Sequence, residues 1–129
     1  VLGSGKITRA VIVGAGKLGK ALLCYDGFPE FGIDICAAFD KDAEKCGKFA
    51  DSKDILPMSD MTSFCKDHDV KIGIITVPES QAQSVCDALV QAGVAGIWNF
   101  APASLTAPES IKIKDENLAS SLAVLTACL

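Results

Sequence analysis

A glycine motif near the start of the chain constrains its fold more than any other sequence feature. Gly14, Gly16 and Gly19 have the spacing G-x-G-x-x-G, and they follow directly after the apolar, mostly β-branched run 10–13. The residues after the motif, up to Leu23, predict a helix. A buried strand, a tight glycine turn and a helix in this order form the start of a βαβ unit.

Each glycine has its own physical role in such a turn. Gly14 permits the tight turn, Gly16 lets the backbone approach a pyrophosphate without a Cβ in the way, and Gly19 lets the helix pack close to the strand. The first N–H groups of the helix and its dipole then attract the phosphates. A glycine-rich turn that binds no nucleotide is the alternative. The other positions of the turn that we expect to contact a cofactor are Ala15, Lys17 and Leu18.

An acidic residue stands at the end of the next predicted strand, 33–39. Asp40 lies 21 residues after Gly19, the spacing at which a carboxylate reaches the adenosine ribose of a dinucleotide. It can accept hydrogen bonds from both ribose hydroxyls, and its charge repels a 2′-phosphate. NAD(H) is therefore favoured over NADP(H), although the neighbouring Lys41 weakens that preference.

Strand-like and helix-like segments alternate along the chain. Short apolar runs predict buried strands, and the amphipathic or capped segments between them predict helices. This alternation favours an α/β fold, a single Rossmann-like domain whose doubly wound parallel sheet is covered on both faces. The run 111–114 alternates and predicts a half-exposed edge strand. The other predicted strands are 10–13, 33–39, 55–56, 70–77 and 96–100, and the helices after the glycine turn are 41–47, 59–67 and 78–92.

Ligands of such sheets bind outside the carboxyl ends of the strands, so two further strand ends should lie beside the glycine turn and Asp40. Thr76 can line the adenosine or the pyrophosphate, while Pro78 fits equally well as the first residue of a helix. Asn99 can hydrogen-bond a carboxamide, and Phe100 can form an apolar wall or belong to the core. The complete segments are Thr76, Val77 and Pro78, and Asn99, Phe100, Ala101 and Pro102.

The sequence offers no catalytic or metal-binding constellation. A dehydrogenase needs an acid or base beside the nicotinamide. The single histidine, His68, lies in a polar stretch that we expect at the amino end of the sheet, away from the ligand. We expect Tyr25 to be a packing residue. The cysteines form no C-x-x-C pair, which favours buried, reduced thiols in a cytoplasmic protein. We therefore expect a nucleotide-binding domain that is not an enzyme and holds no metal. The cysteines are Cys24, Cys36, Cys46, Cys65, Cys86 and Cys128.

Charge and length limit the partners. The formal net charge of −4 predicts weak binding to nucleic acid, and no apolar run is long enough for a membrane span. The 129 residues suffice for one domain, which we place at 1–115. The segment 116–129 predicts a helix whose apolar seam covers either its own sheet or a partner. Because the chain does not begin with Met, we expect a larger polypeptide. The seam consists of Leu118, Leu122, Leu125 and Leu129.

Five phrases stand in order along the chain: VIVGAGKLGKALL, AAFDKD, IITVP, GIWNFAP and NLASSL. Together they resemble the C-terminal, NAD(H)-binding domain of the Rex family of redox-sensing transcriptional repressors. The resemblance implies a homodimer that responds to the NADH/NAD⁺ ratio, in which NADH releases operator DNA from N-terminal winged-helix domains that this chain lacks. It also implies that the helix from about Glu116 is exchanged between the two subunits.

The chain departs from the usual pattern of that family at three places. Lys17 stands where Asn is usual and adds a cation beside the pyrophosphate. Asn117 stands where Asp is usual and cannot carry its charge, and 126–128 replace aromatic residues. Two other functions also fit the sequence. One is a CoA-binding domain, against which Asp40 counts because CoA carries a 3′-phosphate, and the other is the nucleotide-binding fragment of an oxidoreductase.

Overall fold

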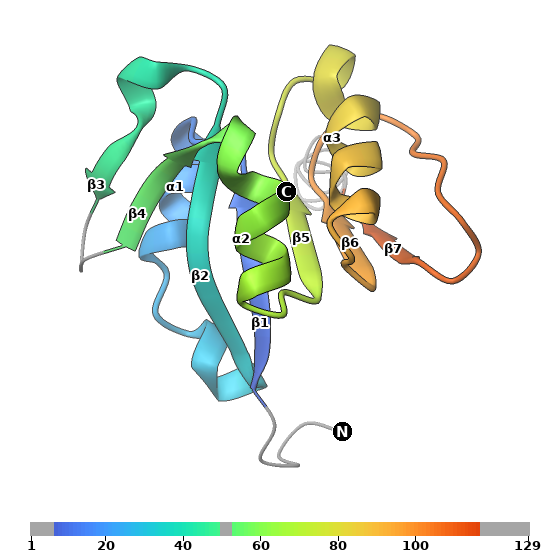
Figure 1. Ribbon diagram of the computed structural model, residues 1–129, viewed down its shortest axis with the longest axis horizontal. Helices are drawn as coiled ribbons and strands as arrows, with labels where there is room; N and C mark the ends of the chain where they lie inside the picture. The colour runs from blue at the N-terminus through green and yellow to red at the C-terminus, as the bar shows by residue number, and fades with distance from the viewer. Residues whose placement is uncertain (1–6, 50–52, 117–129) are drawn as a thin grey trace, which may run out of the picture.

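The computed structural model describes residues 7–49 and 53–116 (Figure 1). The predictions about the leucine seam, the exchanged helix and Asn117 fall in 117–129 and lie outside the described residues. The strands are β1 (Thr8–Val13), β2 (Ile33–Asp40), β3 (Gly47–Phe49), β4 (Lys53–Pro57), β5 (Ile72–Ile75), β6 (Gly96–Asn99) and β7 (Lys112–Asp115). The helices are α1 (Lys17–Cys24), α2 (Met61–Asp67) and α3 (Glu79–Gln91), with 3-10 turns η1 (Phe28–Phe31), η2 (Ala43–Lys45) and η3 (Met58–Asp60).

The described strands form one sheet in the order β3-β4-β2-β1-β5-β6-β7. Every neighbouring pair is parallel except β3 and β4, which are antiparallel at one edge. From β1 the chain winds first toward β2 and β4, and then back past β1 toward β5, β6 and β7. The predicted doubly wound parallel sheet is confirmed, and the edge strand expected at 111–114 is β7.

Helices cover both faces of the sheet (Figure 1). Helices α2 and α3 pack on one face, where Val11 and Val13 of β1 meet Leu89 in a fully buried core. Helix α1 and the turn η1 lie on the other face, where Ile12 of β1 meets Leu23. Because successive side chains of a strand point to opposite faces, the single strand β1 contributes to both cores. Its apolar run is therefore explained by burial on two sides.

The segment after β2 differs from the short helix predicted over 41–47. The carboxylate of Asp42 accepts a hydrogen bond from the backbone N–H of Glu44 at 3.0 Å, which caps the single turn η2. Gly47, with φ of +138°, then begins strand β3, which pairs with β4. Pro78 also differs slightly from its predicted place, because it is extended and caps α3 instead of starting it.

The described cysteines are all free, but their burial varies. Cys65 and Cys86 are buried, Cys24 is exposed, and Cys36 and Cys46 are half-buried. Burial, with a smaller contribution from the nearby Cys36, raises the pKa of Cys65 to about 11. Burial also raises the pKa of Cys86. Both thiols are therefore protonated at neutral pH and are poor nucleophiles. None of the helices in the described part is long and apolar enough to cross a membrane.

Helix α1 lies in direct contact with the strand ends at Gly19. A Cβ added at Gly19 would collide with the carbonyl oxygen of Gly14 and would stand 3.1 Å from Oγ1 of Thr76. Gly14 itself has φ of +108°, a conformation in which side chains are strained. At Gly16, by contrast, an added Cβ would meet no atom within 4 Å. The close approach of helix and strand therefore depends on Gly14 and Gly19, and not on Gly16.

We expect the substitution Gly19→Ala to lower the free energy of unfolding by about 1–3 kcal/mol, because the backbone of the turn must move to admit the methyl group. The matched control is Gly16→Ala, which meets no steric obstacle and should cost less than about 1 kcal/mol through its effect on the helix cap. Urea unfolding followed by circular dichroism measures both. Equal stability of the two variants would contradict the close packing at Gly19.

Candidate functional site

A cavity of about 710 Å³ lies at the carboxyl ends of β2, β1, β5 and β6. It brings together the glycine turn and the three other strand ends that the sequence predicted to meet. The predicted residues that line it are Gly14, Gly16, Leu18, Asp40, Lys41, Thr76, Val77, Pro78, Phe100, Ala101 and Pro102. The predicted residues that are not among the lining residues are Ala15, Lys17, Gly19 and Asn99.

The carboxylate of Asp40 fixes the glycine turn relative to the end of β2. Its Oδ2 accepts a hydrogen bond from the backbone N–H of Ala15 at 2.7 Å, and its Oδ1 accepts one from the N–H of Asp42 at 2.8 Å. The N–H of Gly14 adds a backbone bond of 2.8 Å to Phe39 O. Ala15 therefore contributes to the site through its amide, which holds the turn, while Asp40 still faces the cavity.

The hydroxyl of Thr76 joins the ends of β5 and β1. Its Oγ1 lies 2.7 Å from the carbonyl oxygen of Gly14 and 3.1 Å from that of Val13, and the hydroxyl donates to these oxygens. Its backbone N–H also donates to Val13 O at 2.9 Å. The hydroxyl proton is thus used within the fold, so toward a ligand Thr76 Oγ1 can only accept a hydrogen bond.

Asn99 is only 1% exposed, and its side chain holds the turn that follows β6. Its Nδ2 donates to Ala103 O at 2.9 Å and to Oδ1 of Asp115 at 3.0 Å, and its Oδ1 accepts from the N–H of Ala101 at 3.0 Å. The sequence suggested that this amide could bond a carboxamide. The structure instead commits it to the protein, because its two N–H groups and its oxygen already have partners.

Sequence reasoning missed the contribution of α3 to the cavity. Gln81, Ser84 and Val85 line the cavity from one face of this helix. Residues three and four positions apart share one face of a helix, and α3 follows directly after the end of β5. This spacing could have predicted that the three residues face the cavity. The remaining unpredicted lining residues are Val13, Phe39, Asp42, Lys45 and Met58.

The charged groups of the cavity are confined to one end. Asp40, Lys41, Asp42 and Lys45 all belong to the end of β2 and the turn after it, whereas the wall 100–102 at the end of β6 is apolar. The glycine turn lies between the two ends. Its helix α1 begins at an N-cap without a side-chain partner, so the first N–H groups of the helix have no capping side chain to compete with an anion.

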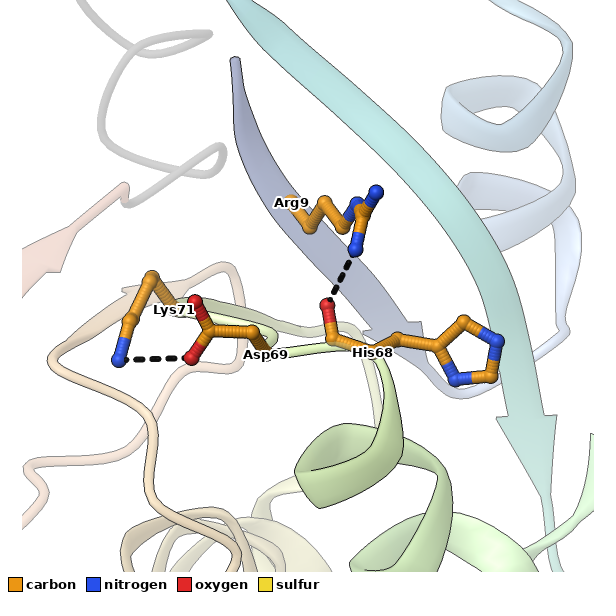
Figure 2. A network of polar contacts seen from close by, with 4 residues as sticks. All are labelled: Arg9, His68, Asp69 and Lys71. Carbon is orange, nitrogen blue, oxygen red and sulfur yellow. Dashed lines mark hydrogen bonds and ion pairs between the residues drawn. The ribbon is translucent and has the colours of Figure 1, made fainter. Parts of the chain in front are cut away.

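His68 lies at the amino ends of the strands, opposite the cavity, as its sequence context predicted. It is exposed at the end of α2, just before β5, and its ring stacks on Phe64 with centroids 4.0 Å apart. Its carbonyl oxygen accepts a hydrogen bond of 2.9 Å from Nη1 of Arg9, next to an ion pair between Lys71 and Asp69 (Figure 2). His68 is therefore a structural residue far from the cavity. Within the described residues, no group of three or more potential ligands could hold a metal ion.

Comparison with known proteins places this geometry in context. Residues 5–103 match the family model described as a CoA binding domain. The chain is 41% identical over 124 residues to the redox-sensing transcriptional repressor Rex of Treponema denticola, covering 96% of this chain and 59% of that protein. It is 42% identical over 126 residues to Rex of Carboxydothermus hydrogenoformans, covering 98% of this chain and 61% of that protein. These relatives are named as repressors and not as enzymes, and the chain spans about three fifths of their length.

Two solved structures are similar along nearly the whole chain. One is RSP, a Rex-family repressor, in complex with β-NADH, with a TM-score of 0.89 and 29% identity over 95% of this chain and 59% of that one. The other is RSP in complex with β-NAD⁺ and operator DNA, with a TM-score of 0.90 and 29% identity over 98% of this chain and 58% of that one. The sequence resemblance to Rex is thus confirmed by independent comparisons.

Because Asp40 accepts two backbone amides, we expect Asp40→Ala to lower the free energy of unfolding by about 1–3 kcal/mol. Asp40→Asn retains one acceptor oxygen and should cost less than Asp40→Ala. Urea unfolding of the three proteins gives the series. If both variants were as stable as the original chain, the two amide bonds would not hold the turn.

Proposed function

We propose that this chain binds NAD(H) and senses the NADH/NAD⁺ ratio for a transcriptional repressor. The premise is that the chain belongs to the CoA-binding domain family and resembles the Rex repressors along nearly its whole length. One observation supports this most: the cavity crosses the ends of β2, β1, β5 and β6 and changes from charged to apolar on the way. Three strand spacings separate its ends by roughly 14 Å, which suits a dinucleotide laid across the sheet.

The β2 end suits the adenosine ribose and the pyrophosphate. Each oxygen of Asp40 accepts one backbone amide and has a further lone pair with which to accept a ribose hydroxyl. Gly16 lines the cavity with open space where a Cβ would stand, and α1 directs its first N–H groups toward that space. These features favour a bound diphosphate between the two ends of the cavity.

The β6 end suits the nicotinamide and favours its reduced form. The ring carries a positive charge in NAD⁺ and none in NADH. The wall 100–102 presents apolar residues, and the acidic lining residues of the described part, Asp40 and Asp42, lie at the other end. Desolvating a cation against an apolar wall is costly, so this end should prefer NADH. A ligand can shift a conformational equilibrium only by such a difference in affinity.

The proposed cofactor site therefore includes residues of three kinds. The turn surrounds the pyrophosphate, the end of β2 contacts the adenosine, and the ends of β5 and β6 form the floor and the far wall. Asn99 belongs to the site as the residue that holds the wall. The proposed residues are Gly14, Ala15, Gly16, Lys17, Leu18 and Gly19; Asp40 and Lys41; Thr76, Val77 and Pro78; and Asn99, Phe100, Ala101 and Pro102.

We further propose that the domain spans 1–115 and that 116–129 serves homodimerisation in the cytoplasm. A second, apolar cavity of about 320 Å³ over β5, β6 and β7 supports this, because it offers an apolar surface, lined by Ile72, Ile97 and Trp98 among others, to a helix with a leucine seam. Operator DNA, which RSP holds in one of its two complexes, would be bound by a winged-helix domain outside this chain.

CoA is the second candidate ligand, because the family model is described by it. Lys41 and Lys45 line the adenosine end and favour an additional phosphate there, whereas Asp40 opposes it. The two lysines are exposed and screened by solvent, while Asp40 is fixed by two backbone amides. The balance therefore favours an unphosphorylated ribose.

Calorimetric titration of the chain with NADH and NAD⁺ tests the proposed function. We expect both to bind, with NADH tighter by about tenfold or more, since the cationic ring of NAD⁺ loses solvation at the apolar wall. A large excess of CoA should not displace NADH. Equal affinities would contradict the sensing of the NADH/NAD⁺ ratio, and displacement by CoA would favour the second candidate.

A further inference from the structure

The segment 100–110 belongs to no helix or strand, and its first three residues, 100–102, form one wall of the cavity. It leaves the end of β6, runs beside α3 and returns to the start of β7 (Figure 1). Apart from the bond from the Phe100 N–H to Ile75 O at 2.9 Å, no described backbone hydrogen bond joins this segment to the sheet, so beyond Phe100 its position depends on the side chains that reach it. Two side-chain amides, those of Asn99 and Gln83, perform this task from opposite ends.

Asn99 holds the near end of the segment. Its buried amide bonds the N–H of Ala101 and the carbonyl of Ala103, and thereby closes the turn that carries the lining residues Phe100 and Pro102. Its third bond, to the carboxylate of Asp115, ties this turn to the end of β7. The apolar wall is thus fixed to two strands of the sheet.

Gln83 holds the far end from the side of α3. Its Nε2 donates to Thr106 O at 2.8 Å, and its Oε1 accepts from the N–H of Thr106 at 2.9 Å. The two bonds pair an amide side chain with a backbone residue as a neighbouring strand would. Nε2 also donates to Oδ1 of Asp87 at 2.8 Å, which orients the Gln83 amide. Cys86, fully buried beside it, has its thiol 3.9 Å from Thr106 O.

These contacts connect the wall to the same helix that lines the cavity. Gln81, Ser84 and Val85 of α3 lie in the cavity lining, and Gln83 stands among them without lining it. Helix α3 therefore lines the cavity directly through these residues and helps to fix the wall 100–102 through Gln83. A wall held in place before a ligand arrives spares the ligand the entropic cost of ordering it.

We propose that Gln83 is a positioning residue for the nicotinamide end of the cavity: through its two bonds to Thr106, and together with Asn99, it holds the wall 100–102 in its binding position. This inference rests on the proposed function, since the wall is assigned there to the nicotinamide. Gln83 touches neither the adenosine end nor the glycine turn in any described contact. Substitution of Gln83 should therefore weaken the binding of ligands whose nicotinamide reaches the wall 100–102, and not of ligands that occupy the adenosine end alone.

The test compares NADH with ADP, which has only the adenosine end, on the full chain carrying Gln83→Met. Methionine keeps the length of the side chain and favours a helix, but forms none of the three amide bonds. We expect the affinity for NADH to fall about tenfold while that for ADP changes less than about twofold. The matched control is Gln91→Met, an exposed position near the end of α3, which should change neither affinity.

A second measurement follows the wall itself. In the ligand-free chain, Cys86 is fully buried, and its thiol lies close to Thr106 O. Loss of the Gln83–Thr106 bonds should therefore speed the reaction of Cys86 with a maleimide. Peptide mass spectrometry assigns the modification to Cys86. Binding of NADH that Gln83→Met leaves unchanged, or an equal loss of NADH and ADP binding, overturns the positioning role. Failure of the unmodified chain to bind NADH overturns the proposed function and this inference with it, even if Cys86 labelling shows that Gln83 holds the segment.

Discussion

The carboxylate of Asp40 makes the contact on which the arrangement of the cavity depends. With one oxygen it binds the amide of Ala15 in the glycine turn, and with the other it binds the amide of Asp42 after β2. A single side chain therefore fixes both the glycine turn, to which we assign the diphosphate, and the end of β2, to which we assign the ribose. Because Gly19 brings α1 against the same turn and Thr76 binds its carbonyl, the turn is held from three sides and is formed before a ligand binds.

The opposite end of the cavity is built differently. At the β6 end the backbone becomes irregular after Phe100, whose N–H still bonds Ile75 O, and amide side chains hold the chain beyond that point. Asn99 is the central residue there, because its side chain bonds the wall and Asp115, and its carbonyl accepts the N–H of Glu116. The wall and the chain that leaves β7 thus share one buried residue. A displacement of the wall would therefore also act on Glu116 at the end of β7.

The parts of this structure that follow a period or a fixed spacing could be predicted from sequence. The apolar run of β1, the glycine spacing and Asp40 at the next strand end each reflect a local rule, and topology then placed the strand ends together. Local chemistry at single residues could not be anticipated. The expected helix ends after one turn because the backbone is extended at Cys46 and Gly47, with φ of +138°, begins β3. Asn99 at a strand end looks the same in sequence whether it faces a cavity or the protein. Gln83 bonds a residue 23 positions away, which no local pattern records.

The same cavity shape is compatible with a family described by CoA and with relatives that bind NAD(H), so the difference must lie in the charges along it. Both ligands share an adenosine diphosphate, and only the phosphate on the ribose of CoA would stand beside Asp40. Two backbone amides prevent this carboxylate from turning away, whereas Lys41 and Lys45 are exposed and can be screened by salt. A fixed negative group opposes a phosphate more strongly than two mobile, solvated cations attract it. The selectivity that we propose for an unphosphorylated ribose would therefore arise from the same two bonds that hold the glycine turn in place.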